Sequence, residues 1–227
     1  MVAMNDNENA EKANESADSA EAKKLSVWLS ELQEKIPMVY GNVAVFSEML
    51  KPEHSDFFDT YATFNNLLIF DVMTVVTVTL GSLFDESNHS QTISLMNLLG
   101  FCQKNKEKIL ASAFGGSSEE KKTDFQKSID RCKQKLDDPE SIRMIDALRK
   151  ARDKVIAHYD KSIYLNANPM SNFSLGDAIG LATLASEIIN EIAKTSKALP
   201  PAEPRSGNEG DFRKILLLCE RKQGLGL

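Results

Sequence analysis

The segment from residue 148 to residue 160 reads LRKARDKVIAHYD, and it combines an apolar helical face with a permanent charge. At about 100° per residue in a helix, six apolar side chains lie within roughly 80° of the direction of Arg152. They are Ile142, Ile145, Leu148, Val155, Ile156 and Tyr159. Arginine stays charged, and removing an unpaired charge from water costs several kcal/mol. We therefore predict that Arg152 lies in the middle of a buried face and has a partner.

The sequence leaves three partners open for Arg152: a buried carboxylate, a second copy of the same surface, or a phosphate. An arginine on an apolar stripe most often extends its head group to solvent or forms an internal ion pair. Asp71 lies near the apolar stripe of a preceding helix and is the first candidate carboxylate. An internal pair of Arg152 with Asp71 would favour a non-catalytic helical binding or regulatory module.

Residues 151 to 160 also resemble a known motif. Arg152 is followed by the polar residue Asp153, and five residues separate Arg152 from His158. This pattern resembles the Arg-polar-(x)-His signature of the HEPN superfamily (higher eukaryotes and prokaryotes nucleotide-binding). The ending Ala157-His158-Tyr159-Asp160 is similar to the abortive-infection branch of that superfamily.

The resemblance implies a metal-independent endoribonuclease, acting as a toxin or phage-defence effector. His158 would be the base that deprotonates the ribose 2′-hydroxyl, because its pKa suits neutral pH. Arg152 would bind the phosphate, and Asp153 would orient Arg152 or His158 by hydrogen bonding. The partners would be RNA and an antitoxin protein, with no membrane and no cofactor.

The resemblance also implies a homodimer with one composite cleft. On an ideal helix Arg152 and His158 diverge by roughly 120° and lie about 9 Å apart along the axis, so one chain serves a single phosphate poorly. In the branch paired with nucleotidyltransferase antitoxins, a tyrosine stands two positions after the histidine and receives nucleotides. That position is Asp160 here and the tyrosine is Tyr159, so this modification is not carried over.

The composition predicts a single cytoplasmic domain. A chain of 227 residues with 42% hydrophobic residues can bury a sizeable core. The net charge of −6 argues against a general nucleic-acid coat protein, although a local cationic cleft with Arg149, Lys150 and Lys154 remains compatible. Three cysteines without CxxC spacing suggest neither a disulfide framework nor a zinc site.

Apolar spacings of three and four predict an all-α fold, an antiparallel up-and-down helical bundle with a short C-terminal helix. The expected helices span residues 25–50, with a bend or break at Pro37 and Gly41, then 55–84, 91–113, 119–136, 139 to beyond His158, and 174–198. Residues 74–80 are rich in β-branched side chains and could also form a strand, but the length of the segment and the helical spacing on either side of it favour a helix. Expected caps are Ser90, Ser117 with Glu120, Asp138, and Ser174 with Asp177.

The sequence also divides the chain into three parts. Residues 1–24 are expected to form a disordered acidic tail, because they are polar throughout and lack the apolar segment of a signal peptide. Residues 25–199 form the bundle. Residues 200–227 hold a Pro-rich linker and a short helix at 211–221, which could dock on the body or on a second copy.

Overall fold

The structure is a computed structural model that describes residues 20–55, 60–86, 92–114, 118–157 and 173–198. These residues form six α-helices and one short 3-10 helix. In order they are α2 (Ala20–Met49), η1 (Pro52–His54), α4 (Ala62–Leu83), α5 (Leu95–Phe114), α6 (Glu119–Leu136), α7 (Pro139–Ala157) and α9 (Leu175–Ser196). The predicted all-α class is confirmed. The predicted C-terminal helix at 211–221 lies outside the described residues.

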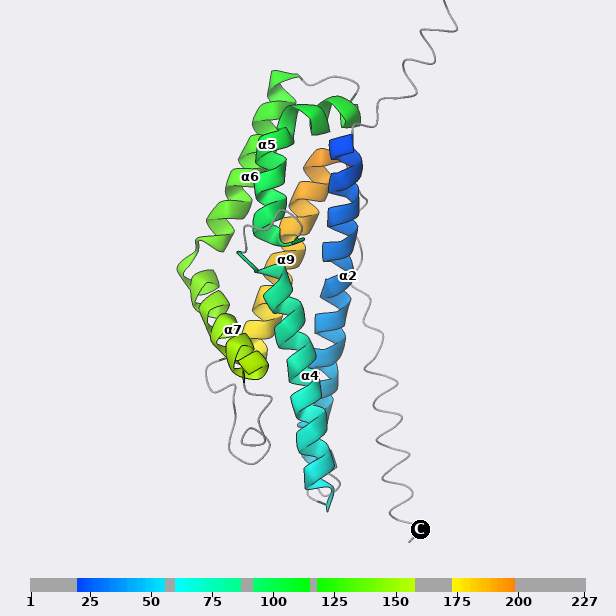
Figure 1. Cartoon of the computed structure of the whole chain (residues 1–227), viewed down its shortest axis with the longest axis vertical. Coiled ribbons are helices and arrows are strands. Elements are labelled where there is room, and N and C mark those ends of the chain that lie inside the picture. Colours follow the sequence, from blue (N-terminus) through cyan, green and yellow to red (C-terminus); the bar gives the residue numbers. More distant parts are fainter. Residues whose placement is uncertain (1–19, 56–59, 87–91, 115–117, 158–172, 199–227) are drawn as a thin grey trace, which may run out of the picture.

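The helices build four antiparallel rods, two continuous and two broken (Figure 1). α2 and α9 are the continuous rods, and they pack against each other. α4 and α5 follow one another along α2, while α6 and α7 follow one another along the opposite edge of the bundle. The up-and-down connectivity expected from short connections is therefore present, with two of its four rods interrupted.

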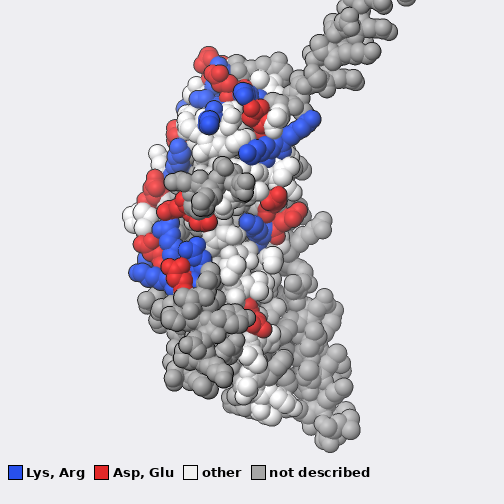
Figure 2. Space-filling model, in the orientation of Figure 1, with Lys and Arg blue, Asp and Glu red and all other residues white. Residues whose placement is uncertain are grey.

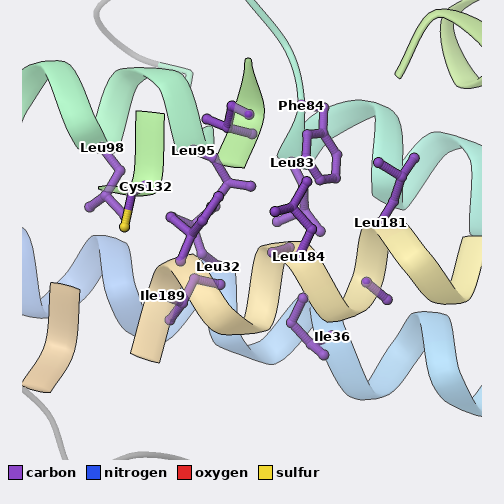
Figure 3. Packing of buried hydrophobic residues seen from close by; sticks show 14 of the residues in the cluster. Leu32, Ile36, Leu83, Phe84, Leu95, Leu98, Cys132, Leu181, Leu184 and Ile189 are labelled. Atoms are coloured by element: carbon purple, nitrogen blue, oxygen red, sulfur yellow. The ribbon is translucent and has the colours of Figure 1, made fainter. Parts of the chain in front are cut away.

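One apolar core runs through all four rods. Leu32 and Ile36 of α2 point toward Leu184 and Ile189 of α9, and Leu95 of α5 lies above them (Figure 3). The chain around the α4–α5 break is itself part of this core, since Leu83, Phe84, Leu95 and Leu98 are all buried. The described residues on both sides of the break are therefore held in the core by apolar contacts.

The first rod is longer and less interrupted than the sequence predicted. α2 begins at Ala20 and continues to Met49 without a break at Pro37 or Gly41. A proline inside a helix removes one backbone hydrogen bond and costs about 3 kcal/mol or more. The buried side chains on both sides of Pro37 offset this cost, and Ile36, Val39 and Val43 all belong to the core.

Two helix starts also differ from the prediction. The third helix begins at Leu95 rather than near residue 91, and its first free amide is capped by Ser94, whose hydroxyl accepts from Asn97 N at 3.4 Å. Ser90 lies outside the described residues. α6 is capped by Ser118, which accepts from Lys121 N, and not by Ser117 with Glu120. In runs of adjacent serines the pattern predicts a cap but not which serine supplies it.

Residues 74–80 are helical, so the strand alternative is wrong. β-branched residues favour strands mainly because they pack well on a sheet surface. In this chain Val76 and Leu80 contact the core across α2 instead, at helical spacing. Tertiary packing therefore decides the conformation of this segment.

The core packing gives a direct stability test. Leu29 in α2 is fully buried, whereas Leu50, just after the same helix, is exposed. Leu29→Ala should lower the free energy of unfolding by about 2–5 kcal/mol, because it removes buried methyl groups and leaves a cavity. Leu50→Ala should change it by less than about 0.5 kcal/mol. Urea unfolding followed by circular dichroism measures both, and equal effects would contradict this core assignment.

Candidate active site around Arg152

α7 carries Arg152 in its last turns, and the start of this helix is fixed by strong local signals. Asp138 accepts a hydrogen bond from Glu140 N at 3.0 Å, and its carbonyl accepts from Ile142 N at 2.9 Å. Pro139 occupies the first helical position, where a missing N–H costs nothing. The predicted Asp138 cap is therefore present, and it sets the register in which Arg152 lies.

A hydrogen-bond network ties the beginning of α7 to the beginning of α9. Arg143 pairs with Glu140 on its own helix and reaches Asp177 of α9, at 2.5 Å between Nη2 and Oδ1. Asp177 also accepts from the backbone N–H and the hydroxyl of Ser174, both at 2.8 Å, in a complete capping box. The two helices that flank residues 158–172 are thus joined by one nearly buried carboxylate.

The other end of α7 packs against the end of α4. Ile145, Leu148 and Ala151 are buried there. Arg149 forms ion pairs with Glu86, just beyond α4, and with Asp146 of its own helix. A Cβ placed on Gly81 of α4 would lie 2.9 Å from Cδ of Arg152, so the arginine stem crosses α4 at its last glycine.

Arg152 does not lie in the middle of a sealed face, as its spacing predicted. Its side chain is 31% exposed. The stem packs on Gly81, while the guanidinium reaches outward, where Nε and Nη2 donate to Oδ1 of Asp153 at 3.3 and 3.2 Å. Long charged side chains commonly bury their methylene groups and keep the charged group in contact with solvent in this way. The helical wheel gave the direction of the Cα–Cβ bond but not the path of the long side chain.

The internal pair of Arg152 with Asp71 is not present. Asp71 is exposed on α4, and among the described residues the carboxylate that pairs with Arg152 is Asp153. Ile142, predicted to lie on the buried face, is also exposed. The side chains of residues 154–157, and His158 with residues 159–172, lie outside what the structure describes. The structure therefore brings together Arg152 and Asp153 from the predicted site and does not place His158.

The three cationic residues near Arg152 differ in burial and in ion pairing. Arg149 is held by Glu86 and Asp146 and is partly buried, whereas Lys150 is exposed. The side chain of Lys154 is among those not described. Figure 2 shows acidic and basic groups interspersed over the α6–α7 edge, without a continuous basic face. Any phosphate contact at this site is therefore local.

The sequence analysis missed one buried polar cluster at the opposite end of α4. Glu48 and His54 are almost completely buried, with 3.3 Å between Oε1 and Nε2, and Lys51 Nζ lies 2.5 Å from Glu48 Oε2. Pro52 turns the chain back after α2 and brings His54 onto Glu48. A glutamate six residues before a histidine carried no recognisable spacing signal. Within the described residues, no group of three or more His, Cys, Asp or Glu is arranged to hold a metal ion.

The chain was compared with models of known protein families. The family model HEPN_AbiU2 matches residues 23–214, which include all the described helices except the first residues of α2. The chain belongs to the AbiU2 family of HEPN proteins. Comparison with curated proteins and with solved structures found no match. The match confirms the predicted resemblance to an abortive-infection-associated HEPN family, and it spans the whole motif from Arg152 to Asp160.

The contact between Arg152 and Gly81 can be measured by a double-mutant cycle. Gly100→Ala, in α5 with no atom within 4 Å of the new Cβ, should stabilise the protein by up to about 1 kcal/mol through helix propensity. Gly81→Ala should stabilise the protein by about 1 kcal/mol less than Gly100→Ala does, because the new Cβ would displace the Arg152 stem. In an Arg152→Ala background, Gly81→Ala should recover the gain. A Gly81→Ala effect that is unchanged by Arg152→Ala would contradict the contact.

Asp177 should make stability depend on pH. Burial alone raises the pKa of this carboxyl, but hydrogen bonds from Ser174 and Arg143 outweigh it and hold the pKa below its ordinary value of 3.8. Its stabilising contribution is therefore complete above the unfolded pKa and is lost as the pH falls through the folded value. Asp177→Asn should cost about 1–2 kcal/mol at pH 7, and the deficit should shrink below the ordinary pKa.

Thermal unfolding at a series of pH values measures this difference. Asp124→Asn is the control, since Asp124 is exposed and its nearest ion-pair contact, with Lys127, is 3.9 Å. A deficit in Asp177→Asn that stays constant down to pH 3 would show that the carboxylate charge does not contribute.

Proposed function

We propose that the protein is a metal-independent endoribonuclease of the HEPN type, acting in the cytoplasm as a toxin or phage-defence effector. The observation that carries the proposal is the partly exposed guanidinium of Arg152 in the last turns of α7, six residues before the His158 of the family motif. The family match supports a nuclease role in abortive infection, and the assignment of RNA as substrate is our inference.

The existing partner of Arg152 is weak enough to be exchanged for a phosphate. The Arg152–Asp153 contacts are 3.2 and 3.3 Å long, and Asp153 is mostly exposed. Exposed ion pairs contribute only about 0–1 kcal/mol. A phosphate can accept two parallel N–H bonds from a guanidinium, which is stronger and geometrically better matched. Asp153 thus holds Arg152 in an outward conformation, and breaking this ion pair when RNA binds costs little free energy.

The proposed reaction is a transfer within the RNA strand. His158 takes the proton of a ribose 2′-hydroxyl, and the 2′-oxygen attacks the adjacent phosphorus. Arg152 stabilises the negative charge that builds on the phosphate oxygens. The bond to the 5′-oxygen breaks, and that oxygen takes up a proton from water, while the protonated His158 returns its proton to the hydroxide that is left. The products are a 2′,3′-cyclic phosphate and a free 5′-hydroxyl.

A homodimer would complete the site. Because Arg152 and His158 would diverge by roughly 120° on an ideal helix, two copies facing each other could supply an arginine from one chain and a histidine from the other. Lys150, exposed on the same helix, is available for a further phosphate contact. In a cell such an activity requires restraint, so an antitoxin protein is the expected second partner.

The alternative of a non-catalytic module drew its support from an internal Arg152–Asp71 pair. Asp71 is exposed and Arg152 pairs with Asp153, so that support is removed.

The function is tested by incubating RNA with the full-length protein in EDTA. Wild type should yield fragments ending in a 2′,3′-cyclic phosphate, and His158→Ala and Arg152→Ala should each lower the rate by about 10²-fold or more. Arg149→Ala is the matched control, because Arg149 lies on the same helix but is engaged by Glu86. It should stay within a few-fold of wild type. Cleavage that requires a metal, or equal cleavage by His158→Ala, would contradict the proposal.

A further inference from the structure

One helix of the bundle exposes an apolar face. The window Asn66–Leu83 of α4 is long and apolar enough to cross a membrane, yet only 39% of it is buried. Leu67 and Val78 are 42% and 45% exposed. Asp71 is the sole charged residue in the sequence of α4, and it is exposed too. Figure 2 shows a largely uncharged surface along the part of the molecule where α4 lies in Figure 1.

Three exposed residues of α4, Leu67, Asp71 and Val78, form a single stripe with the partly buried Thr74. Leu67, Asp71, Thr74 and Val78 follow one another at spacings of four, three and four residues. This is the heptad spacing at which one helix packs along another, because it keeps the side chains on one seam. Gly81, seven residues after Thr74, continues the seam, and the stem of Arg152 lies over it. The seam therefore runs from Leu67 to the candidate active site.

We propose that this seam pairs with the same seam of a second copy, antiparallel about a two-fold axis, and that Asp71 of each copy contacts Arg152 of the other. The proposed dimer interface is inferred from the exposure of α4 alone. That a catalytic cleft lies at this interface rests on the proposed function.

The register follows from the spacing. In an antiparallel pair centred between Thr74 and Val78, Thr74 of one copy faces Val78 of the other. Asp71 then faces Gly81 and Ser82 of the second copy. Because Gly81 is where Arg152 crosses α4, the exposed carboxylate meets the partly exposed guanidinium. A two-fold axis forms this contact twice, so the single charge of each α4 is neutralised.

The same register brings the two active sites close together. Gly81 lies about five residues from the centre of the pair, or roughly 7.5 Å along the helix. The two Arg152 side chains are then about 15 Å apart along the axis direction, at the edges of one shared cleft. A pairing centred lower on α4, near Leu67, would separate the sites much further and would leave Asp71 without a cation.

A second copy fits this surface better than a lipid bilayer does. A carboxylate near the centre of a membrane-spanning helix costs about 2.5–3.5 kcal/mol or more, and Asp71 lies inside the apolar window. A helix that lies on a membrane surface usually carries lysine or arginine on its polar face, and α4 has neither. A symmetric protein partner supplies both the apolar contacts and a cation.

The molar mass in solution tests the surface, measured by light scattering on the full-length protein without RNA. Wild type should be a dimer at micromolar concentrations and Val78→Asp a monomer. Ile179→Asp is the matched control, because Ile179 of α9 is also β-branched and 43% exposed, against 45% for Val78. It should remain a dimer. A monomeric wild type, or a dimeric Val78→Asp, would overturn the proposal.

Cysteine cross-linking tests the register, and it does so in proteins that keep most of the seam. In a Cys219→Ser background, Thr74→Cys with Val78→Cys should give an oxidised dimer rapidly, because disulfides need Cα atoms within about 4.4–6.8 Å. Cys102 and Cys132 are buried and do not compete. Thr74→Cys alone should cross-link at least about ten-fold more slowly, because its two copies lie about 6 Å apart along the axis. Equal rates would overturn the register.

The contact between Asp71 of one copy and Arg152 of the other is tested by the effect of charge changes at Asp71 on dimerisation. Asp71→Arg places two like charges together and should weaken dimerisation at least about ten-fold, and this loss should shrink in high salt. Asp71→Asn should weaken it less. No effect of Asp71→Arg on the dimer would overturn the contact. Binding of the wild type to vesicles of anionic lipid, with no dimer in solution, would overturn the proposal as a whole. A dimer that shows the expected cross-links but cleaves no RNA would contradict the proposed function alone.

Discussion

The structure depends on the burial of two continuous helices, α2 and α9, against two interrupted rods, α4 with α5 and α6 with α7. A continuous rod can align its apolar residues along its full length, and the side chains of α2 and α9 form the centre of the core. Each fully buried leucine or isoleucine stabilises the fold by about 1.5–3 kcal/mol relative to an exposed one. The free energy gained by burying α2 and α9 therefore compensates for the change of direction between α4 and α5 and for that between α6 and α7.

The breaks have functional consequences, because they decide which residues reach the surface. At Asp137 and Asp138 the chain ends α6 and begins α7 within two residues, so α7 leaves the line of α6 and packs on the end of α4. There the small residue Gly81 leaves room for the stem of Arg152. A larger residue at that position would push the arginine away from α4. The position of the guanidinium is thus set by a glycine on another helix.

Charge is arranged differently at the two ends of α7. At its start the exposed Arg143 and the nearly buried Asp177 form a short pair that joins two helices, with the cap of α9 built on the same carboxylate. Near its end Arg152 and Asp153 form a longer and exposed pair between neighbours in sequence. The first pair stabilises the fold, since breaking it would leave a buried carboxylate without its cation. The second can open at little cost, as a ligand site requires.

The sequence by itself determined the all-α class, most helix ranges, the Asp138 and Ser174 caps and the family to which the motif points, because these depend on local spacing and on residue types that act within one turn. It could not determine that α2 passes through Pro37 without a break, or that Arg152 reaches solvent. Each of these depends on what lies opposite in space. The conflict between local preference and burial is resolved only when four rods pack together, and the path of a long charged side chain is fixed only by its neighbours on another helix.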